Sequence, residues 1–440
     1  MEICEEMEVE GGNSVPNSNT FNRFGLKNSI QTNFGDDYVF QIVPKDDWTA
    51  IAVSLSTNAV KLYSPQTGQY LGEFKGHSSV INEISFTGPS TSHILYSSSS
   101  DGTIRAWDTR SFQQVLSISA GPSQEVFSFS FGGADNNLLT AGCNSQIFFW
   151  DWRTKKQVAV LEESHMDDVT QVCFIPGHQN KLISASVDGL MCLFDTSGNI
   201  NDDDHLVSVC RTIFHSFHLV YMSMLTKLSI INQAIVYSFC CLNMFHLYVF
   251  LGVMHCYIKK VFNVGTSIGK VGFLGEINQK LWCLTHIETL SVWDWNEARN
   301  VANFEGARTL ASDSWTLDHV DYFVDCHYSA EEDRLWVIGG TNAGTFGYFP
   351  VNYRNTKAIG SPEAVFQGGH AGVVRSVVPM SSIAGRTMQS QSIFGWTGGE
   401  DGRLCCWSSD ESTDMNRSWI SSTLVSKSPK TRSKTRHRPY

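Results

Sequence analysis

Short runs of alternating apolar residues, separated by turn residues, recur along this chain of 440 residues. Alternation over a few residues predicts half-buried strands, and Asp-Gly between two apolar runs is a strong β-hairpin signal. The pattern therefore predicts an all-β chain. Its four clearest copies are 97–108 (SSSSDGTIRAWD), 140–151 (TAGCNSQIFFWD), 184–195 (SASVDGLMCLFD) and 397–408 (TGGEDGRLCCWS).

The copies recur at a regular spacing. Weaker copies lie at 56–64, 286–294 and 342–350. A period of about 40–45 residues is typical of a four-stranded propeller blade, so seven copies predict a seven-bladed β-propeller. Residues 21–30 (FNRFGLKNSI) are a candidate for the last outer strand, because closing the ring would remove exposed sheet edges. An aromatic residue near the end of each copy marks the period: Tyr63, Trp107, Trp150, Phe194, Trp293, Phe349 and Trp407.

Polar residues repeat with the strands and resemble the structural tetrad of WD40 blades. In that family a His, a Ser or Thr, a turn Asp and a Trp are hydrogen-bonded across one blade. The resemblance implies the same role for His77, Ser97, Asp101 and Trp107, and for His370, Thr397, Asp401 and Trp407. The set His165, Ser184 and Asp188 ends in Phe194, which cannot donate a hydrogen bond. The other four copies have Thr57, Asn144, Ile287 and Ala343 in the Asp place.

The same residue types could suggest a hydrolase triad. A triad is needed once, whereas these residues recur with the fold, and satisfying buried polar groups explains them. The sequence has no HExxH motif, no P-loop and no CxxC pair. We therefore expect no catalytic activity, no metal and no cofactor.

One apolar segment interrupts the repeat. Phe194 and Trp293 are 99 residues apart, and the surplus of roughly 52 residues over one period falls at 210–262. Between Leu228 and Ile258 there is no Asp, Glu, Lys or Arg. A translated retained intron is the favoured interpretation; an accessory element packed on the ring and a transmembrane segment are the alternatives. A single membrane crossing would put the two halves of one ring on opposite sides.

Charge and the ends of the chain add three expectations. A net charge of −11 argues against nucleic-acid binding as the main role. The acidic start and twelve scattered Cys argue for free thiols inside the cell, in the nucleus or cytoplasm. We expect a disordered polar segment at 1–20, the propeller at 21–420 and a disordered basic tail at 421–440. The tail could act in nuclear import, contact RNA or have no partner, and its basic residues are Lys427, Lys430, Arg432, Lys434, Arg436 and Arg438.

The arrangement resembles the WD repeat-containing protein 89 family, as a plant-like member with an extra apolar insert. The resemblance rests on 164–174 (SHMDDVTQVCF), 182–194 (LISASVDGLMCLF), 335–345 (LWVIGGTNAGT), 368–377 (GGHAGVVRSV) and 396–407 (WTGGEDGRLCCW). It covers nearly the whole chain except the termini and the insert. It implies a scaffold that binds other proteins, without naming them.

A finer motif occurs in two adjacent copies, as Trp107, Asp108 and Arg110 and as Trp150, Asp151 and Arg153. Trp-Asp-x-Arg resembles the box of WD40 substrate receptors for cullin-RING ubiquitin ligases, where it implies docking of the ligase adaptor. Arginine suits this role because its planar fork pairs with acidic or carbonyl groups. WD40 blades also carry a basic residue there by chance.

These observations predict a non-catalytic protein-interaction scaffold, with other proteins as partners and no small-molecule substrate. The alternative is a substrate receptor of a cullin-RING ligase. A propeller tethered to a membrane through residues 228–258 and a propeller enzyme are less favoured.

Overall fold

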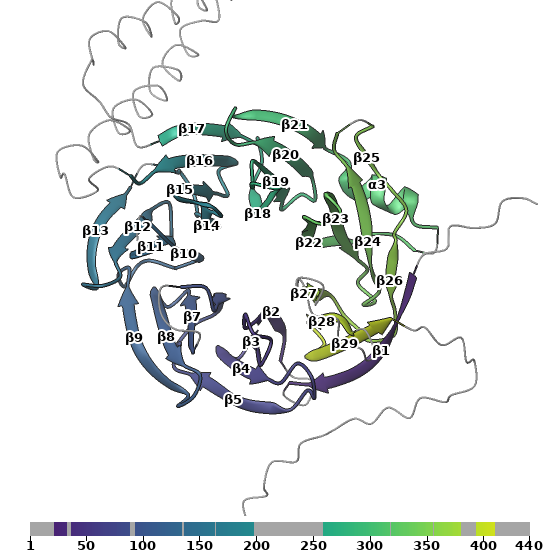
Figure 1. Cartoon of the computed structure of the whole chain (residues 1–440), viewed down its shortest axis with the longest axis horizontal. Coiled ribbons are helices and arrows are strands. Elements are labelled where there is room, and N and C mark those ends of the chain that lie inside the picture. The colour runs from purple at the N-terminus through teal and green to yellow at the C-terminus, as the bar shows by residue number, and fades with distance from the viewer. Residues whose placement is uncertain are drawn as a thin grey trace, which may run out of the picture.

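Seven small antiparallel sheets stand around a central axis and form a closed ring (Figure 1). The computed structural model describes residues 22–32, 37–88, 93–133, 136–162, 164–197, 258–316, 318–354, 356–379 and 393–409. The sheets are the blades of a β-propeller, as the repeat predicted. In each blade the first strand lies nearest the axis and the last lies at the rim.

The first three blades follow the chain without interruption. Blade one has β2 (Val39–Pro44), β3 (Ile51–Leu55), β4 (Ala59–Tyr63) and β5 (Tyr70–Lys75). Blade two has β6 (Ile81–Ser85), β7 (Ile94–Ser99), β8 (Thr103–Asp108) and β9 (Gln113–Ser119). Blade three has β10 (Ser128–Gly132), β11 (Leu138–Gly142), β12 (Ile147–Asp151) and β13 (Lys156–Leu161).

Blades four and five have the same strand order. Blade four has β14 (Gln171–Ile175), β15 (His178–Ala185), β16 (Leu190–Asp195) and β17 (Ile258–Asn263). Blade five has β18 (Ile268–Leu274), β19 (Lys280–Thr285), β20 (Leu290–Asp294) and β21 (Arg299–Phe304). A short helix, α3 (Ala307–Ser314), follows β21 and buries Ala307 and Ala311.

Blades six and seven are joined by the N-terminal strand β1 (Asn22–Gln31). This strand forms the rim of blade seven, antiparallel to β29, and thereby closes the ring as expected. It also pairs in parallel with β26 of blade six, from Asn22 opposite Ala364 to Phe24 opposite Phe366. Blade six has β22 (Tyr322–Ser329), β23 (Arg334–Gly340), β24 (Phe346–Asn352), β25 (Ala358–Ile359) and β26 (Ala364–Phe366). The inner strands of blade seven are β27 (Val374–Pro379), β28 (Ile393–Gly399) and β29 (Arg403–Ser409).

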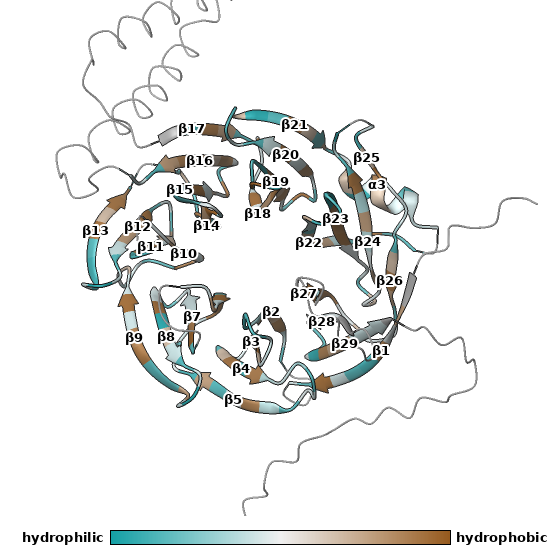
Figure 2. Cartoon of the chain, in the orientation of Figure 1, coloured by the Kyte–Doolittle hydropathy of each residue, from teal (hydrophilic) through white to brown (hydrophobic). Residues whose placement is uncertain are grey.

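The core lies between neighbouring blades. Trp107 of blade two packs in one cluster with Leu62 and Phe74 of blade one, and Trp407 of blade seven packs with Phe346 and Phe366 of blade six. Apolar and polar residues alternate along the strands of the ring (Figure 2). Each blade thus buries apolar side chains against the next, because a single small sheet cannot cover both of its faces.

The end of the expected insert was placed wrongly. Residues 258–262 were assigned to it, but Ile258–Asn263 is the outer strand of blade four and pairs with β16. Here Phe262 is buried while Val261 is exposed, so the segment has the one-sided burial of a rim strand. The apolar residues that precede it concealed this alternation in the sequence.

Several expectations lie outside the described residues and stay predictions: the polar segment 1–20, the insert from 210 to 257 and the basic tail 421–440. None of the helices among the described residues has the length and apolar character of a membrane-crossing segment.

Candidate functional site

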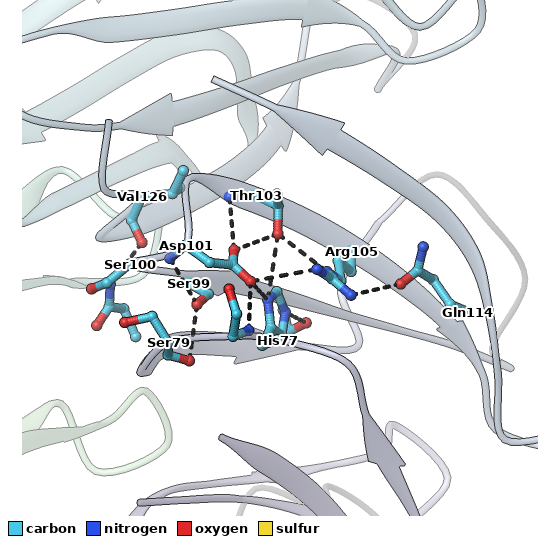
Figure 3. A network of polar contacts seen from close by, with 12 residues as sticks. His77, Ser79, Ser99, Ser100, Asp101, Thr103, Arg105, Gln114 and Val126 are labelled. Carbon is cyan, nitrogen blue, oxygen red and sulfur yellow. Dashed lines mark hydrogen bonds and ion pairs between the residues drawn. The ribbon is translucent and has the colours of Figure 1, made fainter. Parts of the chain in front are cut away.

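A chain of buried polar contacts crosses blade two from the core to the loops. The Trp107 indole N–H donates to Ser97 Oγ at 2.8 Å, and Ser97 Oγ lies 2.7 Å from His77 Nε2. His77 Nδ1 in turn lies 2.9 Å from Asp101 Oδ2. Asp101 sits at the centre of these contacts, between His77, Thr103 and Arg105 (Figure 3). The structure thus brings all four residues of this set together.

The protonation states follow from the environment. Burial lowers the pKa of His77, although Asp101 opposes the change. Burial also disfavours ionisation of Asp101, yet hydrogen bonds from Thr103, His77 and Ser78 hold its pKa below the ordinary 3.8. Near neutral pH, a neutral His77 therefore donates from Nδ1 to an ionised Asp101 and accepts the Ser97 hydroxyl at Nε2. Every buried donor in the chain then has an acceptor.

Two further blades repeat this geometry. In blade seven, Trp407 donates to Thr397 Oγ1 at 2.8 Å, and His370 Nε2 lies 2.8 Å from the same oxygen. His370 Nδ1 lies 3.1 Å from Asp401. In blade four, His165 lies 2.6 Å from Ser184 Oγ and 3.0 Å from Asp188, while Phe194 supplies no donor.

These aspartates also fix the loops at one end of the ring. Each accepts the backbone N–H of the residue that follows the histidine: Ser78 at 3.0 Å, Met166 at 2.9 Å and Ala371 at 2.8 Å. The loop that enters each blade is thereby fastened to the hairpin between its second and third strands. We call this end of the ring the hairpin face.

The four blades without the turn Asp use other groups for the same link, which the sequence did not reveal. Ser56 accepts the Tyr38 N–H in blade one, and Asn144 accepts the Glu125 N–H in blade three. In blade six the roles are exchanged, since Asp321 of the entering loop accepts the Asn342 N–H of the hairpin. In blade five, Ser267 Oγ lies 2.6 Å from His286 Nδ1.

Exposed apolar side chains stand on the hairpin face. Val80, Met166 and Ile287 are 43%, 77% and 64% exposed. Met166 lies directly after His165, so its backbone is held by Asp188 while its side chain points to solvent. Asp167 and Asp168 follow it. The loops of the hairpin face therefore present apolar groups from a fixed backbone.

The two Trp-Asp-x-Arg motifs lie at the opposite end, in the hairpins between the third and fourth strands of blades two and three. Trp107 and Trp150 are buried, so a partner could reach only the Asp and Arg of each motif. Arg110 is exposed, and its guanidinium grips Asp108 through contacts of 3.1 and 2.8 Å. Asp151 holds the backbone N–H of Arg153 at 2.7 Å, as Asp108 holds that of Arg110 at 2.8 Å.

Residues that could support catalysis have structural surroundings. Residues 265–269 (GTSIG) have the Gly-x-Ser-x-Gly spacing of a hydrolase nucleophile, but they lie in the loop entering blade five rather than between a strand and a helix. Burial raises the pKa of the Cys143 and Cys283 thiols to about 12, which suits small apolar core residues. No group of three or more His, Cys, Asp or Glu among the described residues could hold a metal ion.

A seven-bladed ring whose blades carry a His, Ser or Thr, Asp and Trp network is a WD40 β-propeller. The family model "WD domain, G-beta repeat" matches residues 68–108 and 155–195. Each match starts beside or in the rim strand of one blade and ends with the third strand of the next, so each sequence repeat joins two blades.

Comparison with known proteins agrees. The chain is 58% identical to WD repeat-containing protein GTS1 of Arabidopsis thaliana, over 100% of both chains. It is 28% identical to the WD repeat-containing protein 89 homolog of Dictyostelium discoideum, over 78% of each. A shorter match, 29% identical over 24% of this chain and 25% of the relative, is WD repeat and SOCS box-containing protein 1 of Xenopus tropicalis. The chain belongs to the WD40-repeat family, which confirms the resemblance to WD repeat-containing protein 89.

Proposed function

We propose that this protein is a non-catalytic scaffold that binds a protein partner on its hairpin face. The observation that carries the proposal is the backbone of that face, which is tied down in every blade while apolar side chains remain in solvent. Such groups bind with little loss of backbone entropy, because their loops are already ordered. Large exposed apolar groups also fit a protein partner better than a polar small molecule.

The chain offers a matched control for this proposal. Ile277 is 69% exposed, like Ile287, but lies at the other end of β19, in the hairpin from β18. The test is affinity purification with mass spectrometry from cells expressing Met166→Asp with Ile287→Asp, or Ile277→Asp alone. The proposal expects the first variant to lose partners that the second retains. Equal partner lists for both variants would place the binding surface elsewhere.

We also propose a second, narrower role as a substrate receptor of a cullin-RING ubiquitin ligase. The equal turn geometry of Arg110 and Arg153 in adjacent blades supports this role. Because these turns face away from the hairpin face, one end of the ring could hold an adaptor while the other holds a substrate. Arg110, already oriented by Asp108, would offer its remaining N–H groups to an acidic or carbonyl partner.

The narrower role is tested by Arg110→Ala with Arg153→Ala. Arg299→Ala is the matched control, since Arg299 is an exposed arginine in the corresponding hairpin of blade five, where Asn296 occupies the place of the motif arginine. The ligase adaptor should co-purify with the wild type and with Arg299→Ala but not with the double variant. Absence of the adaptor from wild-type complexes after gentle lysis would refute the role.

A further inference from the structure

Side chains of the innermost strands join neighbouring blades in a repeating pattern. Gln41 of blade one accepts the Ile84 N–H of blade two at 2.8 Å, and Glu83 of blade two accepts the Phe129 N–H of blade three at 2.9 Å. The same bond runs from Ser128 to the Val172 N–H (2.7 Å), from Gln171 to the Val271 N–H (2.8 Å) and from Ser376 to the Ile42 N–H (3.0 Å). We call these five bonds the inner latches.

The latches follow the repeat. Each donor is the residue directly after the one that holds the latch position in its own blade: Ile84 follows Glu83, and Phe129 follows Ser128. The physical cause is the inner edge of each blade. Its innermost strand has a neighbour on one side only, so every second N–H points to the axis without a strand partner. A side-chain acceptor from the preceding blade satisfies one of them.

Blades five and six depart from this pattern because charges occupy their latch positions. Lys270 of blade five forms an ion pair with Asp325 of blade six at 2.7 Å. Glu288 accepts the Phe323 N–H at this junction, and the Tyr322 hydroxyl accepts the Val374 N–H between blades six and seven. Among the five inner latches, Glu83 is the only acceptor that can ionise; the others are amides and hydroxyls.

The surroundings of Glu83 disfavour its charge. The strands packed against β6 are β2, β3, β7 and β10, and Tyr96 of β7 is their only titratable side chain. Two groups act from more distant blades, Lys270 of blade five and Cys173 of blade four. Burial raises the pKa of Glu83 from its ordinary 4.5 to about 7, against the smaller opposing effects of the Phe129 N–H and Lys270. An ionised Glu83 therefore gains hydration when the two blades separate.

We propose that Glu83 makes the junction between blades two and three a pH-responsive latch, closed when its carboxyl group is protonated and opened more readily when it is ionised. The junction also separates Arg110 from Arg153, which lie in these two blades, so the latch governs their relative placement. The latch itself does not depend on any docking role of the arginines.

The test is hydrogen exchange of the full-length protein between pH 4.5 and 8.5, with protection corrected for the intrinsic pH dependence of exchange. The opening constant reported by the Phe129 amide should rise with pH, by at most about 300-fold in total, and level off above pH 7. Glu83→Gln keeps an acceptor but cannot ionise, so its Phe129 protection should not change with pH. The Val271 amide, held by Gln171, is the control in the same sample.

A second variant, Gln171→Glu, should transfer the pH dependence to Val271. A flat Phe129 profile in the wild type would overturn the proposal. So would a slope that persists in Glu83→Gln, or an equal slope at Phe129 and Val271, which would indicate opening of the whole ring.

Discussion

Removal of the N-terminal strand should destabilise the entire propeller, although β1 contributes one of the four strands of one blade. A chain that begins at residue 32 lacks Asn22–Gln31 and leaves the edges of β29 and β26 without their partner. Blades six and seven then lose their shared strand. Because the ring is continuous, the loss opens it at a single junction.

The size of the effect follows from the side chains that β1 contributes. Phe24 and Leu26 pack against the cluster around Trp407, and Ile30 packs against the cluster around Trp396. Phe24 stacks on Phe366 at 4.9 Å between ring centroids. Three partly buried side chains contribute about 3 kcal/mol, and the core that they cover contributes a similar amount. The backbone hydrogen bonds roughly offset the entropy of ordering the strand. The loss of about 6 kcal/mol is comparable with a total stability of about 5–15 kcal/mol.

Urea unfolding followed by tryptophan fluorescence measures this loss, with limited proteolysis as a second readout. A chain lacking only residues 1–20 is the control, because it retains all of β1 and should unfold at the wild-type urea concentration. Phe24→Ala should give an intermediate loss of about 1–2 kcal/mol. Equal unfolding midpoints for the chains that begin at residues 21 and 32 would show that β1 does not carry the closure of the ring.

Three further outcomes can be measured by the same unfolding assay. Trp407→Phe removes the indole donor to Thr397 and should cost about 2–4 kcal/mol; an unchanged midpoint would exclude a stabilising role for that bond. Thr140 is buried and its hydroxyl has no hydrogen-bond partner among the described residues, so Thr140→Val should stabilise by about 1 kcal/mol, and a clear loss would contradict this. Lowered aspartate pKa values contribute stability that is complete above their ordinary 3.8 and is lost as pH falls through the folded values, so unfolding should begin below about pH 4; a midpoint that stays constant from pH 5 to 2.5 would refute this sign for Asp101, Asp188 and Asp401.

Local patterns carried most of the fold. The spacing of Tyr63, Trp107, Trp150 and Phe194 predicted the blades, since the hairpin turn and the apolar runs of each blade lie close together in the chain. The need to cover an open sheet edge predicted that residues 21–30 close the ring. The end of the insert was predicted wrongly, because one strand among many apolar residues has no distinct signal before it pairs.

The candidate site divides in the same way. Three polar networks could be predicted, because His77, Asp101 and their equivalents recur at similar spacings. The substitute links in the other four blades could not, since Asp321 and Asn342 exchange the usual roles of loop and hairpin.

The sequence by itself determined the number of blades, their strand order and the polar networks that stabilise three of them. Only the tertiary structure decided which side chains join one blade to the next. Glu83 and Phe129 are 46 residues apart, and Gln171 and Val271 are 100 apart. The side chain at each latch position varies, because its acceptor meets a backbone N–H, which every residue except proline provides. A bond of this kind leaves no paired pattern in the sequence and exists only once the ring has closed.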